Sequence, residues 1–397
     1  MDTPETNGSE AHTATPTEII DHLLNLAIEH RASDIHFEPG RDEFKVRFRI
    51  DGILHPIEKF DRSIQEEVIS RIKVLSQMDI TEHRLPKDGH FEFPYKDLLY
   101  NIRVSTLPET YGESVVFRIH GAKEVVYKID ELGLEPDQLE LLKNLIRSPS
   151  GMILVTGPAG SGKTDFLYSV LTHLSSEEKN IITLEDPVEY SLENIRQTSI
   201  SEELGLTFAA AMRSVLRQDP DILMLGEIRD GETALLAIQA SLSGILLFST
   251  FHTFDLPALI NRLVEMDIDR SIVVQSIRGV VSKRLVRKIC ENCKEVVTPT
   301  QEQLALLPPD MVNDVFYHGR GCEVCQHLGY FERTGIFEII EVDDEIRANI
   351  FDSESNVVLL EILKKKNIKN LRAAAFGKVK AGVTTIDEAL RVIGHLK

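Results

Sequence analysis

The residues best suited to chemistry form a glycine-rich loop near the middle of the chain. The loop follows the apolar run Met152–Val155 and precedes a stretch with helical periodicity, Thr164–Leu174. Glycines let backbone N–H groups curl around phosphates, and the N-terminus of the following helix adds a partial positive charge. We therefore predict a phosphate-binding Walker A loop made of Gly157, Pro158, Ala159, Gly160, Ser161, Gly162, Lys163 and Thr164.

Lys163 and Thr164 carry the polar groups of this loop. We expect the Lys163 ammonium to reach the β- and γ-phosphates of a nucleoside triphosphate and the Thr164 hydroxyl to ligate Mg²⁺. A glycine-rich turn with a solvated lysine is the alternative, and it is disfavoured because strand, loop and helix follow in the order that the motif requires. The next residue, Asp165, is a carboxylate close to the phosphates, so its side chain must point away from them.

Two further acids follow apolar runs that read as buried strands. Glu227 comes after Ile222–Leu225, and Glu185 comes after Ile181–Leu184. Attack on a γ-phosphate needs a carboxylate that orients or deprotonates water. An acid at the end of a buried strand can also serve Mg²⁺, as Glu227 would do with Thr164. The residues alone leave the choice of catalytic base between Glu185 and Glu227 open.

All four cysteines of the chain fall in two Cys-x-x-Cys pairs. Clustered pairs of this kind indicate metal binding in a cytosolic chain, and a disulfide framework is the feature of secreted ones. Four thiolates suit a closed, tetrahedral Zn²⁺ site, which staples a subdomain and takes no part in catalysis. We predict such a site, with free buried thiols as the alternative, at Cys290, Cys293, Cys322 and Cys325.

Composition limits the classes of protein that can hold these residues. Hydrophobic residues make up 42% and charged residues 27%, which is ordinary for a globular protein with a core. The formal net charge of −19 argues against a nucleic-acid backbone as the main partner. No apolar run approaches the roughly 20 residues of a transmembrane helix, and the first residues lack a secretory signal, so we expect a cytoplasmic protein.

The elements that position these residues fall into segments with different hydrophobic periodicity. Residues 1–15 are polar and are expected to be a disordered tail. Residues 16–120 begin with an amphipathic helix, for which Thr17 is the expected N-cap, and continue with alternating strands, which indicates a small α+β domain. A linker is expected at 121–134, followed by a larger domain at 135–397.

The larger domain alternates short apolar runs with helical stretches. This alternation predicts an α/β fold with a parallel sheet buried on both faces. Within it, residues 286–330 are expected to form the zinc subdomain and residues 341–397 a set of C-terminal helices. The segment Arg278–Lys294 is rich in lysine and arginine, and we expect either a solvated helix face or an interface with a neighbouring subunit or acidic partner. A DNA-binding surface is the weaker third alternative.

Four motifs in this order and spacing resemble the Walker A, Asp box, Walker B and His box of the secretion ATPase superfamily. They are Gly157–Thr164, Thr183–Tyr190, Ile222–Glu227 and Ser249–Thr253. The longer run Leu216–Asp230 is close to diagnostic, and the N-terminal domain of the family is matched by Ala32–Pro39, Arg47–Gly52 and Gly112-Glu113. From about residue 16 onward the chain resembles the GspE/PilB/PilT type of ATPase. The tetracysteine segment is similar to that of the GspE and PilB branch.

This resemblance implies a RecA-like core that binds ATP and a PAS-like N-terminal domain that covers the nucleotide. It implies that Glu185 is the base and that Glu227 belongs to the magnesium shell. It also implies that His252 senses the γ-phosphate, and that the N-terminal domain supplies two arginines, Arg103 and Arg118. A buried structural histidine and solvated strand arginines are the plainer alternatives for these last three residues.

The resemblance further implies a homohexameric ATP hydrolase with ATP, Mg²⁺ and Zn²⁺ as its cofactors. Such a motor would drive type II secretion or type IV pilus assembly through an inner-membrane platform protein, staying cytoplasmic and peripheral to the inner membrane through that partner. A DNA-uptake pilus motor is the alternative within the family. A RecA-like nucleic-acid translocase is disfavoured by the acidic charge, and a nucleotide-binding scaffold without turnover is disfavoured by the intact acidic and basic residues.

Overall fold

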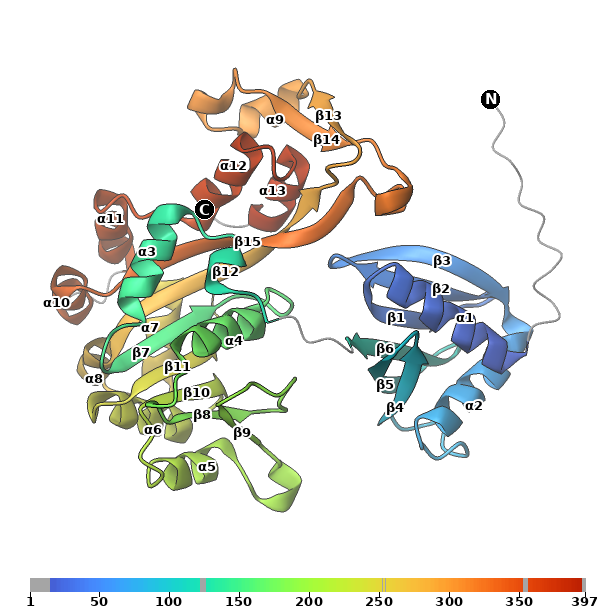
Figure 1. Cartoon of the computed structure of the whole chain (residues 1–397), viewed down its shortest axis with the longest axis horizontal. Helices are drawn as coiled ribbons and strands as arrows, with labels where there is room; N and C mark the ends of the chain where they lie inside the picture. The colour runs from blue at the N-terminus through green and yellow to red at the C-terminus, as the bar shows by residue number, and fades with distance from the viewer. Residues whose placement is uncertain (1–14, 122–125, 252, 254, 353–355, 395–397) are drawn as a thin grey trace. The chain divides into compact units, whose positions relative to one another are not determined.

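The computed structural model describes residues 15–121, 126–251, 253, 255–352 and 356–394 (Figure 1). The chain divides into two compact units, Met1–Val125 and Val126–Lys397. Each unit has its own sheet and its own core. His252, which the family resemblance implicates in sensing the γ-phosphate, lies outside the described residues.

The first unit is an antiparallel sheet with the strand order β3-β2-β1-β6-β5-β4. Apolar side chains alternate along the strands, so that one face of β2 buries Phe44, Val46 and Phe48. The helices supply further apolar side chains to this core. The elements are α1 (Pro16–Glu29), β1 (Ala32–Pro39), β2 (Glu43–Ile50), β3 (Ile53–Asp61), α2 (Gln65–Leu75), β4 (Lys87–Tyr95), β5 (Leu98–Glu109) and β6 (Gly112–His120).

The first helix begins two residues earlier than predicted. Its N-cap is Thr15 and not Thr17, because Thr15 and Glu18 form a reciprocal capping box. The Glu18 N–H donates to the Thr15 hydroxyl oxygen at 3.3 Å, and the Thr15 N–H donates to a Glu18 carboxylate oxygen at 2.7 Å. Pro16 then occupies the first helical position, where its fixed φ suits the helix and its missing N–H costs nothing.

The second unit is built on a sheet with the order β15-β12-β7-β11-β10-β8-β9. Neighbouring strands from β12 to β9 run parallel, and β15 pairs antiparallel with β12. The predicted α/β fold with a parallel sheet is therefore confirmed. The strands are β7 (Gly151–Thr156), β8 (Ile181–Glu185), β9 (Arg196–Ser199), β10 (Ile222–Glu227), β11 (Leu246–Phe251), β12 (Ile277–Ile289) and β15 (Tyr330–Glu341).

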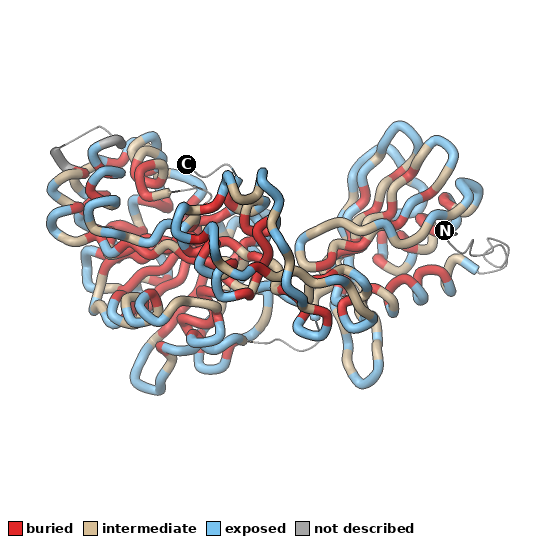
Figure 2. The backbone as a smooth tube through the Cα atoms, turned by 90° about the horizontal axis from the view of Figure 1, so that it is seen from above, coloured by how far each residue is buried: buried red, intermediate tan, exposed pale blue. Residues whose placement is uncertain are grey.

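Helices cover both faces of this sheet, and its strands β7, β8 and β11 are buried throughout their length; the buried residues of the second unit gather in its interior (Figure 2). Met152 and Leu154 of β7 face one core, whereas Ile153 and Val155 face the other. Helices α3 (Pro136–Leu145) and α4 (Lys163–Leu174) pack on the second of these faces. The first is covered by α5 (Phe208–Val215), α6 (Gly231–Leu242), α7 (Leu256–Glu265), α8 (Arg270–Ser276), α10 (Asp344–Asp352) and α11 (Asn356–Lys365).

The end of the chain packs around the far part of β12 and β15. Helices α12 (Leu371–Lys380) and α13 (Ile386–Ile393) share a core with Val286 of β12 and Ile336 of β15. The same core reaches Phe316 of β14. The remaining elements here are β13 (Lys294–Val297), β14 (Phe316–Gly319) and α9 (Gln301–Leu306), and the short 3₁₀ turns of the chain are Arg62–Ile64, Ile129–Glu131, Glu202–Leu204, Pro309–Met311 and Glu323–Cys325.

The segment that follows the boundary at Val125 belongs to the second unit. Ile129 and Leu132 of this segment are buried in the core of that unit.

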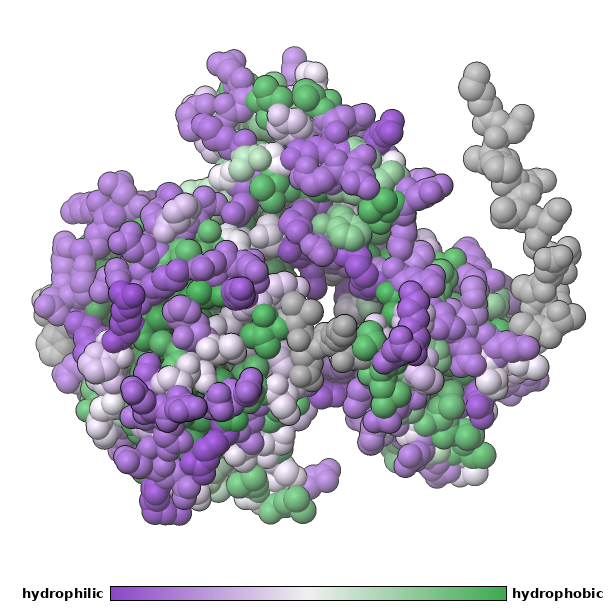
Figure 3. All heavy atoms as spheres, viewed as in Figure 1, coloured by the Kyte–Doolittle hydropathy of each residue, from purple (hydrophilic) through white to green (hydrophobic). Residues whose placement is uncertain are grey.

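The face of the second unit seen in Figure 3 is largely hydrophilic, with hydrophobic side chains in small groups. Among the described residues no helix is both long enough and apolar enough to cross a membrane.

Candidate active site at the Walker A loop

The Walker A loop connects β7 to α4 with glycines in left-handed backbone conformations. Gly160 has a φ of 72° and Gly162 a φ of 74°, values that side chains with a Cβ rarely adopt. Gly162 is the N-cap of α4, and Lys163 and Thr164 begin the helix. The loop therefore turns its backbone around the positive end of a buried helix, as phosphate binding requires.

Lys163 lies against the loop itself. Its ammonium donates to the carbonyl oxygens of Gly157 at 2.9 Å and Pro158 at 3.1 Å. Burial lowers the pKa of Lys163, the nearby Arg284 cation lowers it further, and the Glu227 carboxylate opposes both effects. The ammonium is thus held within electrostatic reach of the acid that ends β10.

Glu185, at the end of β8, is a buried carboxylate surrounded by hydrogen-bond donors. It is 2% exposed and accepts hydrogen bonds from the Tyr168 hydroxyl, from the Thr183 hydroxyl at 2.5 Å and from the Gln197 amide at 3.1 Å. Burial, followed by the bond to Glu185, raises the pKa of Tyr168. The tyrosine therefore stays a donor to Glu185, and the donors hold the carboxylate in one orientation.

Glu227, at the end of β10, lies beside a cation from its own domain. Arg229 donates from Nε to Oε1 of Glu227 at 2.7 Å and from Nη2 to Oδ2 of Asp186 at 2.9 Å. Glu227 pairs in register with Thr250 of β11, whose hydroxyl donates to the Gly226 carbonyl at 2.7 Å. The carboxyl ends of β8 and β10 thus bring the predicted acids to the same edge of the sheet as the Walker A loop, the edge where open α/β sheets bind ligands.

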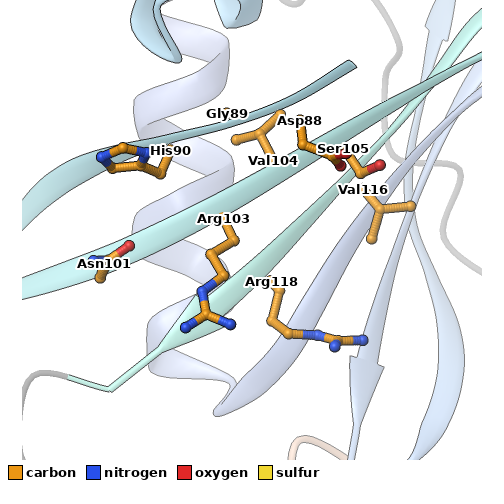
Figure 4. A pocket seen from close by; sticks show the side chains of 9 residues that line it. All are labelled: Asp88, Gly89, His90, Asn101, Arg103, Val104, Ser105, Val116 and Arg118. Atoms are coloured by element: carbon orange, nitrogen blue, oxygen red, sulfur yellow. The ribbon is translucent and has the colours of Figure 1, made fainter. Parts of the chain in front are cut away.

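Arg103 and Arg118 lie opposite each other on β5 and β6 of the first unit. Their side chains extend from neighbouring strands in a pocket that also includes His90 and Asn101 (Figure 4). Arg118 is 66% exposed and donates from Nε to Oδ1 of Asp34 at 3.0 Å. The expectation that the two arginines face away from the apolar core of this unit agrees with their register, because their strand neighbours Ile102, Val104, Phe117 and Ile119 alternate with them.

The cysteines come together as a compact group. All four Sγ atoms lie within 4.8 Å of one another, with separations of 3.9 Å for Cys290–Cys322 and 3.8 Å for Cys293–Cys325. A tetrahedron with Zn–S bonds of about 2.3 Å has edges of about 3.8 Å. Backbone N–H groups of Cys322 and Gly329 also donate to the Cys325 sulfur, at 3.2 and 3.3 Å. The donor set and its spacing therefore fit Zn²⁺.

Sequence reasoning missed several partners of these residues. Tyr168 and Gln197 gave no signal in the sequence, because their neighbours along the chain carry no chemistry. Thr183 could have been found, since it lies two positions before Glu185 on the same face of the strand. Arg229 was not predicted as a partner of Glu227, although it lies two residues after the end of the Walker B strand.

The interpretation of the basic segment Arg278–Lys294 as a solvated helix face is wrong. Most of it is the strand β12, and Lys283 and Arg284 are only 3% and 6% exposed. The two cations lie in the middle of a strand that runs beside β7, so the strand order buries them next to the Walker A loop.

The comparisons with known proteins agree with this geometry. A family model described as "Type II/IV secretion system protein" matches residues 9–391. Type II secretion system protein E of Dickeya dadantii is 43% identical over 376 residues, which cover 94% of this chain and 75% of that protein. The type IV pilus assembly ATPase PilB of Thermus thermophilus is 40% identical over 376 residues, which cover 94% of this chain and 42% of that protein.

A solved structure supports the fold independently. The ATPase DotB of Legionella pneumophila superposes with a TM-score of 0.69 at 20% identity, covering 98% of this chain and 96% of that one. At this identity the likeness concerns the fold alone. The predicted resemblance to GspE and PilB is confirmed by the family match and the curated relatives. This chain therefore belongs to the Type II/IV secretion system protein family of P-loop ATPases.

Proposed function

We propose that the chain binds ATP with Mg²⁺ at the Walker A loop and hydrolyses it there. The observation that supports this proposal is that β8 and β10 end in Glu185 and Glu227 at the edge of the sheet where the Walker A loop holds Lys163. Backbone N–H groups of the loop and the Lys163 ammonium would hold the phosphates. Mg²⁺, when bound, supplies positive charge to the β- and γ-phosphates, and Thr164 and Glu227 would hold it.

We assign the role of general base to Glu185. Its hydrogen bonds from Tyr168, Thr183 and Gln197 fix its orientation, as a group that must position one water requires. Glu227 is more exposed than Glu185, and its carboxylate already pairs with the Arg229 guanidinium. It is therefore suited to bind a metal ion in place of that cation. The different surroundings of the two acids support this assignment.

Arg103, Arg118 and His252 complete the proposed machinery on the strength of the family resemblance. The arginines would neutralise charge that develops on the γ-phosphate, the role that arginine fingers play in other phosphoryl-transfer enzymes. Both arginines line the same pocket and Arg118 is largely exposed, which supports contact with a ligand there. His252 would report the state of the γ-phosphate.

The work done with ATP is inferred from the relatives, which are named as a type II secretion protein and a type IV pilus assembly ATPase. We propose that the chain assembles as a homohexamer and drives secretion or pilus assembly through an inner-membrane platform protein. It would be cytoplasmic and reach the inner membrane only as a peripheral component of that machine. The acidic charge of −19 supports a function without direct nucleic-acid contact.

We propose that Zn²⁺ occupies the tetracysteine group with a structural role. The thiolates of Cys290, Cys293, Cys322 and Cys325 would complete a closed tetrahedron with no open position for substrate. Cys290 directly follows β12, and Cys293 directly precedes β13. The site would therefore fasten the β13–β14 ribbon to the sheet that carries the Walker A loop.

The substitution Glu227→Gln tests the proposal. We expect the variant to bind ATP but to lose most turnover, because the amide cannot replace the carboxylate beside Mg²⁺. The measurements are the dissociation constant of a fluorescent ATP analogue and steady-state phosphate release by the full chain. Arg213, an exposed arginine that pairs with Glu232 on α6, gives the matched control Arg213→Gln. Unchanged turnover in Glu227→Gln would refute the role of this acid.

A further inference from the structure

Lys283 is a buried cation in direct contact with the Walker A loop. Lys283 belongs to β12, which pairs with β7, the strand that leads into the loop. The residue is 3% exposed, and its Nζ donates to the Gly162 carbonyl oxygen at 2.6 Å. The ammonium also lies near the rings of Phe166 and Phe337, 5.9 and 5.7 Å from their centroids. No part of the proposed hydrolytic machinery accounts for this group.

The same strand contacts the beginning of the loop as well as its end. A Cβ added to Gly157 would lie 2.7 Å from the Lys283 carbonyl oxygen and 3.2 Å from Nη1 of Arg284. A Cβ added to Gly162 would lie 2.8 Å from the Lys283 ammonium. The loop therefore has glycine at two points where a side chain would collide with β12, and atoms of Lys283 lie beside both points.

Asp165 explains how the buried charge is tolerated. Its Oδ2 lies 3.5 Å from the position of a Gly162 Cβ, and the Lys283 ammonium lies 2.8 Å from the same position, so the two charges are near each other. The Asp165 carboxylate accordingly raises the pKa of Lys283. A neutral donor would serve the bond to the Gly162 carbonyl equally well, and burying a cation is costly without a compensating anion. A triphosphate held by the loop would add negative charge near Gly162.

We propose that Lys283 is a positioning residue of the nucleotide site, which fixes the carbonyl of Gly162 at the start of α4 and adds positive charge next to the loop that holds the phosphates. This inference rests on the proposed function, because it concerns ATP bound at the same loop. Asp165 acts as the counter-charge that keeps Lys283 protonated before the nucleotide arrives.

Because the charge of Lys283 depends on its protonation state, the proposal predicts that ATP affinity depends on pH. Burial lowers the pKa of Lys283 to about 8, Asp165 on α4 opposes this effect, and Arg333 on β15 adds to it. Arg284 is the charged neighbour on its own strand. Bound phosphates favour the protonated lysine and so raise its pKa, which means that its contribution to ATP affinity is complete below the pKa of the free chain, about 8, and is lost as the pH rises from there through the higher pKa of the complex.

The test measures the dissociation constant of a fluorescent ATP analogue with Mg²⁺ for the full chain, between about pH 7 and pH 9.5. We expect Lys283→Met to weaken binding at pH 7 about tenfold or more, because it removes both the donor and the charge. Lys283→Gln keeps a donor without the charge, so it should bind more tightly than Lys283→Met and should lose the step near pH 8. Lys288→Gln, on the same strand but exposed and paired with Glu332, is the matched control and should behave as wild type.

Asp165→Asn provides a second variant that leaves the core intact, since Asp165 is exposed. It should move the midpoint of the wild-type pH profile to lower pH, and it should leave the profile of Lys283→Gln unmoved. Thermal unfolding of each variant separates loss of binding from loss of fold. If Lys283→Met does not fold, Lys283→Gln and Asp165→Asn still decide the matter.

The outcomes distinguish this inference from the proposed function. If the wild-type chain does not bind ATP, the proposed function fails. If it binds ATP and Lys163→Ala does not, but Lys283→Gln keeps the wild-type affinity and the same pH step, only the role of Lys283 is overturned.

Discussion

Arg229 donates from Nε to Oε1 of Glu227 at 2.7 Å, so the acid proposed to serve the magnesium ion is held by a cation two residues further along the chain. The same guanidinium donates to Oδ2 of Asp186 at 2.9 Å. A metal ion that binds Oε1 of Glu227 would have to exchange with this arginine. We therefore expect Arg229 to compete with the proposed magnesium ion.

We predict that Arg229→Gln lowers the Mg²⁺ concentration needed for half-maximal binding of an ATP analogue. Both partners are partly exposed, so the change should be modest, about threefold to fivefold. A magnesium titration at fixed protein and nucleotide measures it. Arg213→Gln should leave the titration unchanged, and an unchanged or higher magnesium requirement in Arg229→Gln would contradict the competition.

Glu185→Gln should reduce kcat by at least about 100-fold while the ATP dissociation constant changes little, because a positioned base acts in the transition state. Tyr168→Phe removes one of the donors that orient Glu185 and should give a smaller loss of kcat in the same direction. Single-turnover phosphate release separates these effects from product release. If Glu185→Gln retained wild-type kcat, Glu185 would not be the base, and Glu227 would be the next candidate.

The purified chain should contain about one zinc ion, as a closed site of four cysteines implies. Cys290→Ser should lower the zinc content and the Tm of unfolding, because metal binding at such a site is coupled to folding. Elemental analysis and thermal unfolding measure the two effects. A metal-free chain with four thiols that react freely in the native state would exclude the zinc site.

Arg103→Ala and Arg118→Ala should each lower kcat, by up to about 1000-fold if the residue acts as an arginine finger, with little change in ATP affinity. Arg49 is a suitable control, because it also pairs with Asp34, at 3.5 Å, but has no proposed role at the nucleotide. The readout is steady-state ATP hydrolysis at a fixed chain concentration. Equal losses in Arg49→Ala and Arg118→Ala would indicate that Asp34 and its partners only stabilise the first unit.

Much of the fold and site was predictable because local signals agreed with the global structure. The Walker A loop was predictable from its glycines, since Gly160 and Gly162 adopt conformations that few other residues tolerate. Glu185 and Glu227 were predictable because short apolar runs mark buried parallel strands, whose carboxyl ends meet at one edge.

The partners of these residues were not predictable, because they depend on which strands and helices lie side by side. Tyr168 reaches Glu185 from a helix, and Gln197 reaches it from an edge strand. The strand order places Lys283 beneath the Walker A loop, although more than a hundred positions separate the two along the chain. A linear pattern carries no information about such a neighbourhood unless a buried charge draws attention to it.

The central claim is that this chain hydrolyses ATP at the Walker A loop, and the most direct test is the turnover of Lys163→Ala. The Lys163 ammonium both anchors and neutralises the phosphates, so the account predicts that phosphate release by the purified full-length variant falls to background. The wild-type chain and the control Lys288→Gln should hydrolyse ATP at equal rates under the same conditions. Retention of a substantial fraction of wild-type turnover in Lys163→Ala would contradict the account.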